Sequence, residues 1–131
     1  MSALLELDGV DVIFRRGRRT FQALHKVSAT LSAGERVGLV GGSGSGKTTM
    51  LRTLLGLVRP VAGEVRFEGR RIDGLSDKDL ADVRSRVSLV SQDPNASLNP
   101  RMKLREIVAE PLRSPWLKAR EGKESVVAET I

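Results

Sequence analysis

A cluster of glycines and serines between two apolar segments constrains this chain more than any other feature. The segment from Gly38 to Leu57 is "GLVGGSGSGKTTMLRTLLGL". Glycine loses more conformational freedom on folding than any other residue, so a glycine cluster between regular elements indicates a backbone that must bend tightly or be closely approached. The order of an apolar strand, a glycine-rich loop and a helix is that of a phosphate-binding loop.

The spacing of the loop residues matches this interpretation. Gly41 and Gly46 are separated by four residues, and Lys47 and Thr48 follow directly. In such a loop, backbone N–H groups surround the phosphates at a helix N-terminus, whose dipole also favours negative charge. A flexible linker that matches by chance is the alternative, with odds on the order of a few in a thousand from average residue frequencies.

Each residue of the loop therefore has an expected role. Lys47 is expected to reach the β- and γ-phosphates of ATP, Thr48 to offer its hydroxyl to Mg²⁺, and Thr49 to hold the α-phosphate. The predicted nucleotide-binding residues of the loop are Gly41, Gly42, Ser43, Gly44, Ser45, Gly46, Lys47, Thr48 and Thr49.

The pattern of apolar residues predicts an α/β order of elements. The expected β segments are 3–14, interrupted at Asp8-Gly9 near a turn, 21–31, and 63–72 with a turn at Gly69. Short buried strands are expected at 35–40, ahead of the glycine-rich loop, and at 87–90. Helices are expected at 48–57, at 75–86 with Ser76 as N-cap and Asp79 three residues on, and from 104 to 112.

Composition excludes several classes of protein. The chain of 131 residues has no cysteine, which removes disulfide frameworks and thiolate metal sites and fits a reducing compartment. No apolar run approaches the length of a membrane span, and we expect a soluble, intracellular protein. The net charge is +6, with "RRGRR" at 15–19 as the densest basic group. We expect an exposed turn there, and the alternative is a patch that binds a polyanion. The chain has only four aromatic residues, too few for a surface on which bases stack, so we expect no nucleic-acid partner.

A second motif resembles one particular family. The segment "VSLVSQDPNASLNPRM" at 87–102 closely resembles the glutamine loop of ATP-binding-cassette (ABC) transport ATPases, in the version of the peptide and nickel importers. The segment "ALHKVSATLSAGERVGLVGGSGSGKTTMLRTLLGLVRPVAGEVRFEGRRI" follows the N-terminal half of the same family, and "LREIVAEPL" is similar to the entry into its helical subdomain. The resemblance covers residues 4–112, and the tail after Ser114 is not specific.

The resemblance implies a fold and a division of the chain. The implied fold is α/β, a P-loop NTPase-type three-layer core with an N-terminal antiparallel β region, truncated within the helical subdomain. Residues 1–103 correspond to the N-terminal part of the nucleotide-binding domain, with the β region, the P-loop core and the glutamine loop. Residues 104–131 correspond to the start of the helical subdomain.

The resemblance also implies two binding residues outside the phosphate loop. Gln92 matches the glutamine that ligates Mg²⁺ or its water and senses the γ-phosphate. Phe14 matches the aromatic residue that stacks on adenine, with a packed strand residue as the alternative and Phe21 as the other candidate for stacking. Asp93 is open to a rival interpretation as a Walker B aspartate, but the following Pro94 fits the glutamine loop better.

The implied function is that of an ATP-binding subunit, or a fragment of one, in an importer of peptides or a related small solute. The expected partners are a second ATPase subunit, transmembrane permease subunits and, indirectly, a solute-binding protein, with the chain on the cytoplasmic face of the membrane. The alternative is another soluble P-loop NTPase or a small-substrate kinase. No LSGGQ-like signature, late histidine or apolar strand ending in Asp-Glu follows Gln92, so we expect ATP binding without hydrolysis. His25 is expected to cap a turn or lie at the surface, and Trp116 to be a local packing anchor.

Overall fold

The computed structural model describes residues 3–93 and 97–113. These residues fall into two compact units, 1–84 and 85–131, and each unit is described by itself. The packing expected of Trp116 lies outside the described residues.

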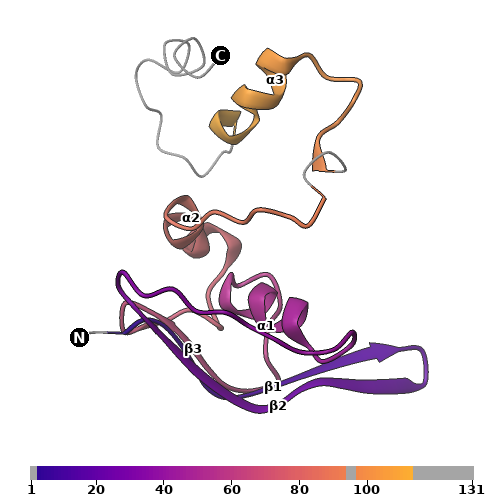
Figure 1. The fold of residues 1–131 in the computed structure, drawn as a ribbon, viewed down its shortest axis with the longest axis vertical. Helices are drawn as coiled ribbons and strands as arrows, with labels where there is room; N and C mark the ends of the chain where they lie inside the picture. The colour runs from indigo at the N-terminus through magenta and orange to yellow at the C-terminus, as the bar shows by residue number, and fades with distance from the viewer. Residues whose placement is uncertain (1–2, 94–96, 114–131) are drawn as a thin grey trace. The chain divides into compact units, whose positions relative to one another are not determined.

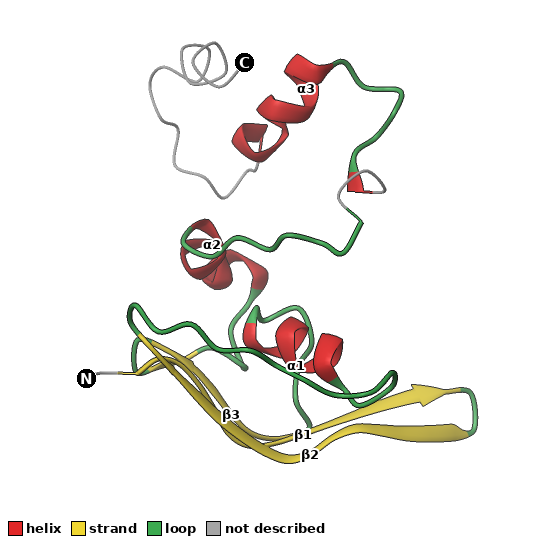
Figure 2. Ribbon diagram, in the orientation of Figure 1, coloured by secondary structure: helices red, strands yellow, loops and turns green. Residues whose placement is uncertain are grey.

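The first unit is built on an antiparallel sheet in the order β2-β1-β3-β4. Figure 1 labels β1, β2 and β3 of this sheet. Its strands are β1 (Ala3–Arg16), β2 (Arg19–Ser32), β3 (Ala62–Phe67) and β4 (Arg70–Arg71). β3 pairs with β1 only between Leu5 and Asp11, so the far end of the β1–β2 hairpin is a two-stranded ribbon (Figure 2). The "RRGRR" segment forms the exposed turn of this hairpin, as predicted, with Gly17 at φ 60°. The β segment predicted at 63–72 is also confirmed, including its turn at Gly69.

The predicted interruption at Asp8-Gly9 is a bulge within β1 rather than a turn. Leu7 pairs with Ala29 and Val10 with Val27, so one more residue lies between the pairs on β1 than on β2. Gly9 has φ 56°, and its N–H donates to the Ser28 hydroxyl at 2.9 Å. The strand therefore continues through the glycine, because a side chain replaces the missing ladder acceptor.

Helix α1 (Lys47–Leu54) packs against β1 and β2. The helix ends three residues before the predicted Leu57, because Gly56 is left-handed at φ 66° and closes the last turn. The Leu57 N–H donates to the Arg52 carbonyl at 2.8 Å, and the Gly56 N–H donates to the Thr53 carbonyl at 3.0 Å. This pair of bonds satisfies carbonyls at the helix end.

Helix α2 (Asp77–Ser85) confirms the predicted helix and its N-cap. The Asp79 N–H donates to the Ser76 hydroxyl oxygen at 3.3 Å, and that hydroxyl donates to Asp79 Oδ2 at 2.6 Å. Leu80 approaches Gly56, where an added Cβ would lie 3.2 Å from Leu80 Cδ2. Among the described residues, the buried hydrophobic ones are Leu7, Val10, Val12, Leu24, Val65, Phe67, Ile72, Leu80 and Val83.

The two predictions of short buried strands are wrong. Neither 35–40 nor 87–90 is a strand, and Val40 and Val90 are 95% and 83% exposed. A parallel strand is stabilised by hydrogen-bond ladders and by cover on both faces. Neither segment has a ladder partner among the described residues, so the apolar pattern alone does not produce a strand. The described residues form the antiparallel β region and helices of the expected fold, without its parallel sheet.

The described part of the second unit contains α3 (Leu104–Ala109) and the short 3₁₀ helix η2 (Glu110–Arg113). The predicted helix from 104 to 112 is confirmed at its start, where the Lys103 N–H donates to Glu106 Oε2 at 2.9 Å. It changes to 3₁₀ geometry around Pro111, which has no N–H for an α-helical bond. Among the helices of the described residues, none has the length and apolar character needed to cross a membrane.

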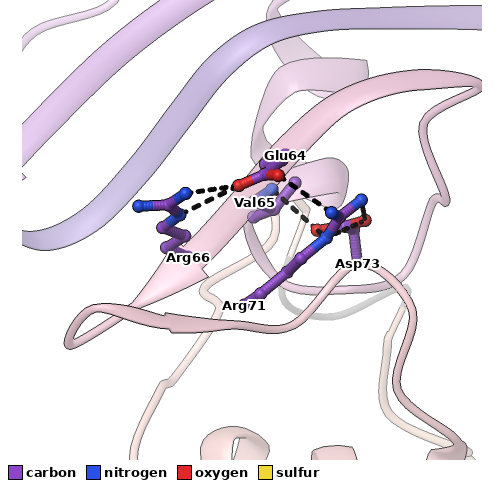
Figure 3. A network of polar contacts seen from close by, with 5 residues as sticks. All are labelled: Glu64, Val65, Arg66, Arg71 and Asp73. Atoms are coloured by element: carbon purple, nitrogen blue, oxygen red, sulfur yellow. Dashed lines mark hydrogen bonds and ion pairs between the residues drawn. The ribbon is translucent and has the colours of Figure 1, made fainter.

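A network of two carboxylates and two arginines joins β3 to the chain after β4 (Figure 3). Asp73 Oδ1 accepts the Val65 N–H at 2.9 Å, and Arg71 binds both Asp73 oxygens. Arg71 also reaches Glu64 Oε1 at 2.9 Å, and Arg66 binds Glu64 Oε2 from the other side. The two carboxylates thus tie β3 to β4 and to the segment that follows it, at the end of the hairpin away from the Gly69 turn.

We predict that this network makes the first unit sensitive to acid. The hydrogen bond from Arg66 lowers the pKa of Glu64 below its ordinary 4.5. Burial raises the pKa of Asp73, but the bonds from Arg71 and the Val65 N–H outweigh it and leave the pKa lowered from 3.8. A lowered folded-state pKa means that the stabilisation is present above the ordinary value and is lost as the pH falls below it.

Thermal unfolding between pH 6 and pH 2 tests this prediction. We expect the melting temperature to decrease once the pH is lowered past about 4.5. This decrease should be smaller in Asp73→Asn than in the wild type. Asp77→Asn is the matched control, because Asp77 is 77% exposed and outside the network. An acid transition in Asp73→Asn as steep as that of the wild type would contradict the assignment.

Candidate nucleotide-binding site

The glycine-rich loop runs directly into the first turn of α1. Gly46 is the N-cap of the helix at φ 89°, Gly44 has φ 79°, and no side chain caps the helix. Both values lie in the left-handed region that residues with a Cβ rarely adopt. The first N–H groups of a helix have no intrahelical acceptors, so this end of α1 presents donors and a positive dipole to an anion.

Lys47 folds back over the loop that precedes it. Its Nζ donates to the carbonyls of Gly41 and Gly42, both at 2.6 Å, and to the Ser45 hydroxyl at 3.2 Å. An added Cβ on Gly41 would lie 2.6 Å from Ser45 Oγ and 3.8 Å from Lys47 Cδ. The structure therefore gathers these four predicted site residues around one positive charge, and a side chain at Gly41 would displace the Ser45 hydroxyl.

The other end of the loop rests on β2. An added Cβ on Gly46 would lie 2.7 Å from the Ala23 carbonyl oxygen and 3.0 Å from Leu24 Cδ2. Glycine is thus required at Gly46 for two reasons, the left-handed backbone and this close approach. The sequence motif indicated the glycine but not the strand residues that it touches.

The two threonines lie on the first turn of α1. Thr48 is exposed, and Thr49 is half-buried with its carbonyl accepting the Thr53 hydroxyl at 2.8 Å. Ser43 is exposed in the turn before the helix. Their predicted roles toward Mg²⁺ and the phosphates remain predictions, and their positions beside Lys47 are compatible with them.

The two candidate aromatic residues lie opposite each other on the hairpin. Phe14 of β1 pairs directly with Phe21 of β2, and the two residues are 43% and 61% exposed. Partners in an antiparallel pair share a face of the sheet, and Phe14 shares that face with the buried Val12, which pairs with Leu24. Both rings are therefore on the face of β1 and β2 that carries the loop contact at Leu24, and base stacking by Phe14 remains a prediction.

Gln92 lies in an exposed bend of the second unit. Next to it, the Ser91 hydroxyl donates to the Asp93 carbonyl at 3.1 Å. Residues 94–96 of the same motif are outside the described residues. Metal binding by Gln92, and the rival role for Asp93, both remain predictions.

His25 lies at the surface, as predicted, with 71% of its side chain exposed. Its Nδ1 is 3.2 Å from Asp11 Oδ1 and 2.9 Å from Gln22 Nε2. Sequence reasoning did not single out Asp11. One sequence signal could have indicated Asp11. It is a carboxylate residue between Val10 and Val12, two apolar residues of the same strand that are both buried in the core.

Comparison with known families decides between the classes of phosphate-loop protein. The family described as "ABC transporter" matches residues 24–130. The chain belongs to this family. It is 45% identical over 112 residues to the oligopeptide transport ATP-binding protein OppF of Haemophilus influenzae, covering 84% of this chain and 34% of that protein. It is 38% identical over 132 residues to the dipeptide transport ATP-binding protein DppF of Lactococcus lactis, covering 98% of this chain and 42% of that protein.

Solved ABC structures confirm the fold class. A dimeric ATP-binding cassette in a post-hydrolysis state, bound to ADP and Pi, matches with a TM-score of 0.75 and 32% identity. The match covers 95% of this chain and 54% of that one. The ABC chain described here thus has the α/β fold of these cassettes, and it spans about a third to two fifths of the length of the curated relatives OppF and DppF.

Proposed function

We propose that this chain is the nucleotide-binding part of an ABC importer subunit that couples ATP binding and hydrolysis to the uptake of peptides or a related small solute. The observation that carries the proposal is the position of Lys47, with Nζ held by the Gly41 and Gly42 carbonyls at the N-terminus of α1. The peptide part rests on the relatives, which are named for oligopeptide and dipeptide transport.

The residues present fit a nucleoside triphosphate with Mg²⁺. Gly46 is left-handed and its α-carbon lies against the Ala23 carbonyl of β2, so it has no room for a side chain, and Lys47 supplies the positive charge. The N–H groups of the loop and the first turn of α1 would bind the phosphates. Thr48 would hold Mg²⁺, which neutralises charge on the phosphate oxygens. A role of Gln92 toward Mg²⁺ is proposed from its resemblance to the glutamine of the family. Thr49 would bind the α-phosphate, and Phe14 would stack on the base.

Because the chain belongs to the ABC family, the alternative function as a small-substrate kinase has no support. In the full-length protein, ATP would close a dimer of two ATPase subunits against transmembrane permease subunits, with a solute-binding protein acting through the permease. The proposed location is the cytoplasmic face of the membrane. The dimeric state of the related cassette supports the first of these partners.

We predict that the site tolerates different purines. The pair of exposed rings at Phe14 and Phe21 offers faces for stacking, and stacking does not distinguish adenine from guanine. Titration calorimetry is expected to give comparable affinities for Mg-ATP and Mg-GTP. A preference of about a hundredfold, or roughly 2.7 kcal/mol, would mean that the base lies elsewhere.

We also predict that the 131-residue chain binds ATP without turning it over. Phosphoryl transfer depends on positioning groups and charge stabilisation around the γ-phosphate. The signature loop and the carboxylate after a Walker B strand do not occur in this sequence. Phosphate release is expected to be no faster than in Lys47→Ala, whereas a Lys47-dependent rate near about 1 s⁻¹ would show a self-sufficient NTPase.

A further inference from the structure

β2 contains two extra residues where it passes beside the phosphate loop. Val12 pairs with Leu24 and Ile13 pairs with Gln22, so Ala23 has no partner on β1. Val10 pairs with Val27, which leaves Asp11 opposite both His25 and Lys26. We call residues 22–26 the bulged segment. Bulges bend a strand and re-aim its side chains, so this segment departs from the path that a regular hairpin would take.

The Asp11 carboxylate binds both ends of the bulged segment. Its Oδ1 accepts the Lys26 N–H at 2.9 Å and the Gln22 side-chain amide at 3.1 Å, with His25 Nδ1 at 3.2 Å. Lys26 has φ 45°, a conformation that a residue with a side chain adopts only when its surroundings hold it there. The Asp11 side chain is only 18% exposed, and the Lys26 N–H is the main cause of its lowered pKa.

The bulged segment in turn supports the phosphate loop. The carbonyl of the unpaired Ala23 and the side chain of Leu24 are the groups that approach Gly46, the residue before Lys47. The same bulge brings the two aromatic residues together. Without the extra residue, the pairing of Val12 with Leu24 would continue to Phe14 with Gln22, and Phe21 would point to the other face.

We propose that Asp11 is a positioning residue for the nucleotide site. By holding the bulged segment, its carboxylate sets the position of Gly46 and Lys47 against β2 and keeps Phe21 opposite Phe14. Asp11 itself touches no ligand, and its effect passes through the backbone of β2. The inference rests on the proposed function in that the ligand is a nucleotide.

The test compares Asp11→Ala with Asp11→Asn in the 131-residue chain. Asparagine keeps an oxygen that accepts the Lys26 N–H, whereas alanine removes it. Asp8→Ala is the matched control, since Asp8 lies on the same strand, is exposed and is not among the groups that contact the bulged segment. By calorimetry with Mg-ATP, we expect Asp11→Ala to bind about tenfold more weakly and the other two within about threefold of the wild type.

Amide hydrogen exchange separates positioning from general loss of structure. In Asp11→Ala, we expect faster exchange at Lys26 and at Met50, whose N–H bonds the Gly46 carbonyl at 2.8 Å. The Val65 amide, held by Asp73, should keep its protection. Equal acceleration at all three amides would indicate a purely structural role and overturn the proposal.

Two further outcomes would also overturn it. One is wild-type affinity in Asp11→Ala, and the other is equal loss of affinity in Asp11→Asn and Asp11→Ala. If Asp11→Ala does not fold, Gln22→Ala removes one exposed donor to the same carboxylate. We expect it to weaken Mg-ATP binding by about fivefold, more than the roughly threefold allowed to the controls, and an affinity within about threefold of the wild type would count against the proposal. If the wild type itself binds no Mg-ATP, the proposed function fails, and the exchange at Lys26, Met50 and Val65 alone decides this inference.

Discussion

Lys47→Ala is expected to abolish measurable binding of Mg-ATP. The ammonium of Lys47 is the positive charge that the loop holds, through the carbonyls of Gly41 and Gly42. A phosphate at the N-terminus of α1 would lose this charge while keeping the backbone N–H groups. Charge-assisted bonds to phosphate are among the strongest single contacts, and we expect a loss of at least about a hundredfold, roughly 2.7 kcal/mol.

A cation on the same helix provides the control for this variant. Arg52 is exposed in the last turn of α1, away from the loop. Arg52→Ala lowers the net charge by the same amount, so it corrects for the general electrostatic effect. Calorimetry should give Arg52→Ala an affinity within about threefold of the wild type. Similar losses in the two variants, or unchanged binding in Lys47→Ala, would contradict the role of Lys47.

Gly63→Ala is expected to cause the largest loss of stability in the first unit. Gly63 has φ 85°, and an added Cβ would lie 2.5 Å from the Gly9 carbonyl oxygen and 2.6 Å from that of Asp8. These atoms belong to the backbone of β1, so they cannot rotate away as a flexible side chain would. Left-handed strain and overpacking together predict a loss of about 2–5 kcal/mol in the free energy of unfolding.

Gly69→Ala is the matched control for strain alone. Gly69 has φ 76°, but nothing lies within 4 Å of an added Cβ. We therefore expect a loss of about 1–2 kcal/mol there. Denaturant unfolding of both variants measures the difference. If Gly63→Ala is no less stable than Gly69→Ala, the result would contradict the close contact between Gly63 of β3 and the bulge at Gly9.

Local features of this chain were predictable from the sequence, because they depend on residues close together in the chain. The phosphate loop is one such feature, since Gly41 to Lys47 carry their own turn geometry and charge. The cap of α2 is another, because Ser76 and Asp79 satisfy each other across one turn. In both cases the residues that make these local turns and bonds lie within one short sequence interval.

Features that depend on distant partners were not predictable. The apolar runs at 35–40 and 87–90 have strand character, but a strand also needs neighbours, and the described residues provide none. The bulged segment follows from the register between β1 and β2, which no single strand reveals. For the same reason, the pairing of Phe14 with Phe21 and the support of Gly46 by Ala23 emerged only from the fold.

The loop between Gly41 and Lys47 and the start of α1 are proposed to bind the phosphates of a nucleotide. Titration of the ¹⁵N-labelled chain with Mg-ATP, followed through backbone amide chemical shifts, tests this most directly. We expect saturable shifts at residues 42–49, with the amides of β3 and α2 unchanged, and no such shifts in Lys47→Ala. Unmoved amides at 42–49 in the wild type, or saturable shifts confined to other residues, would contradict it.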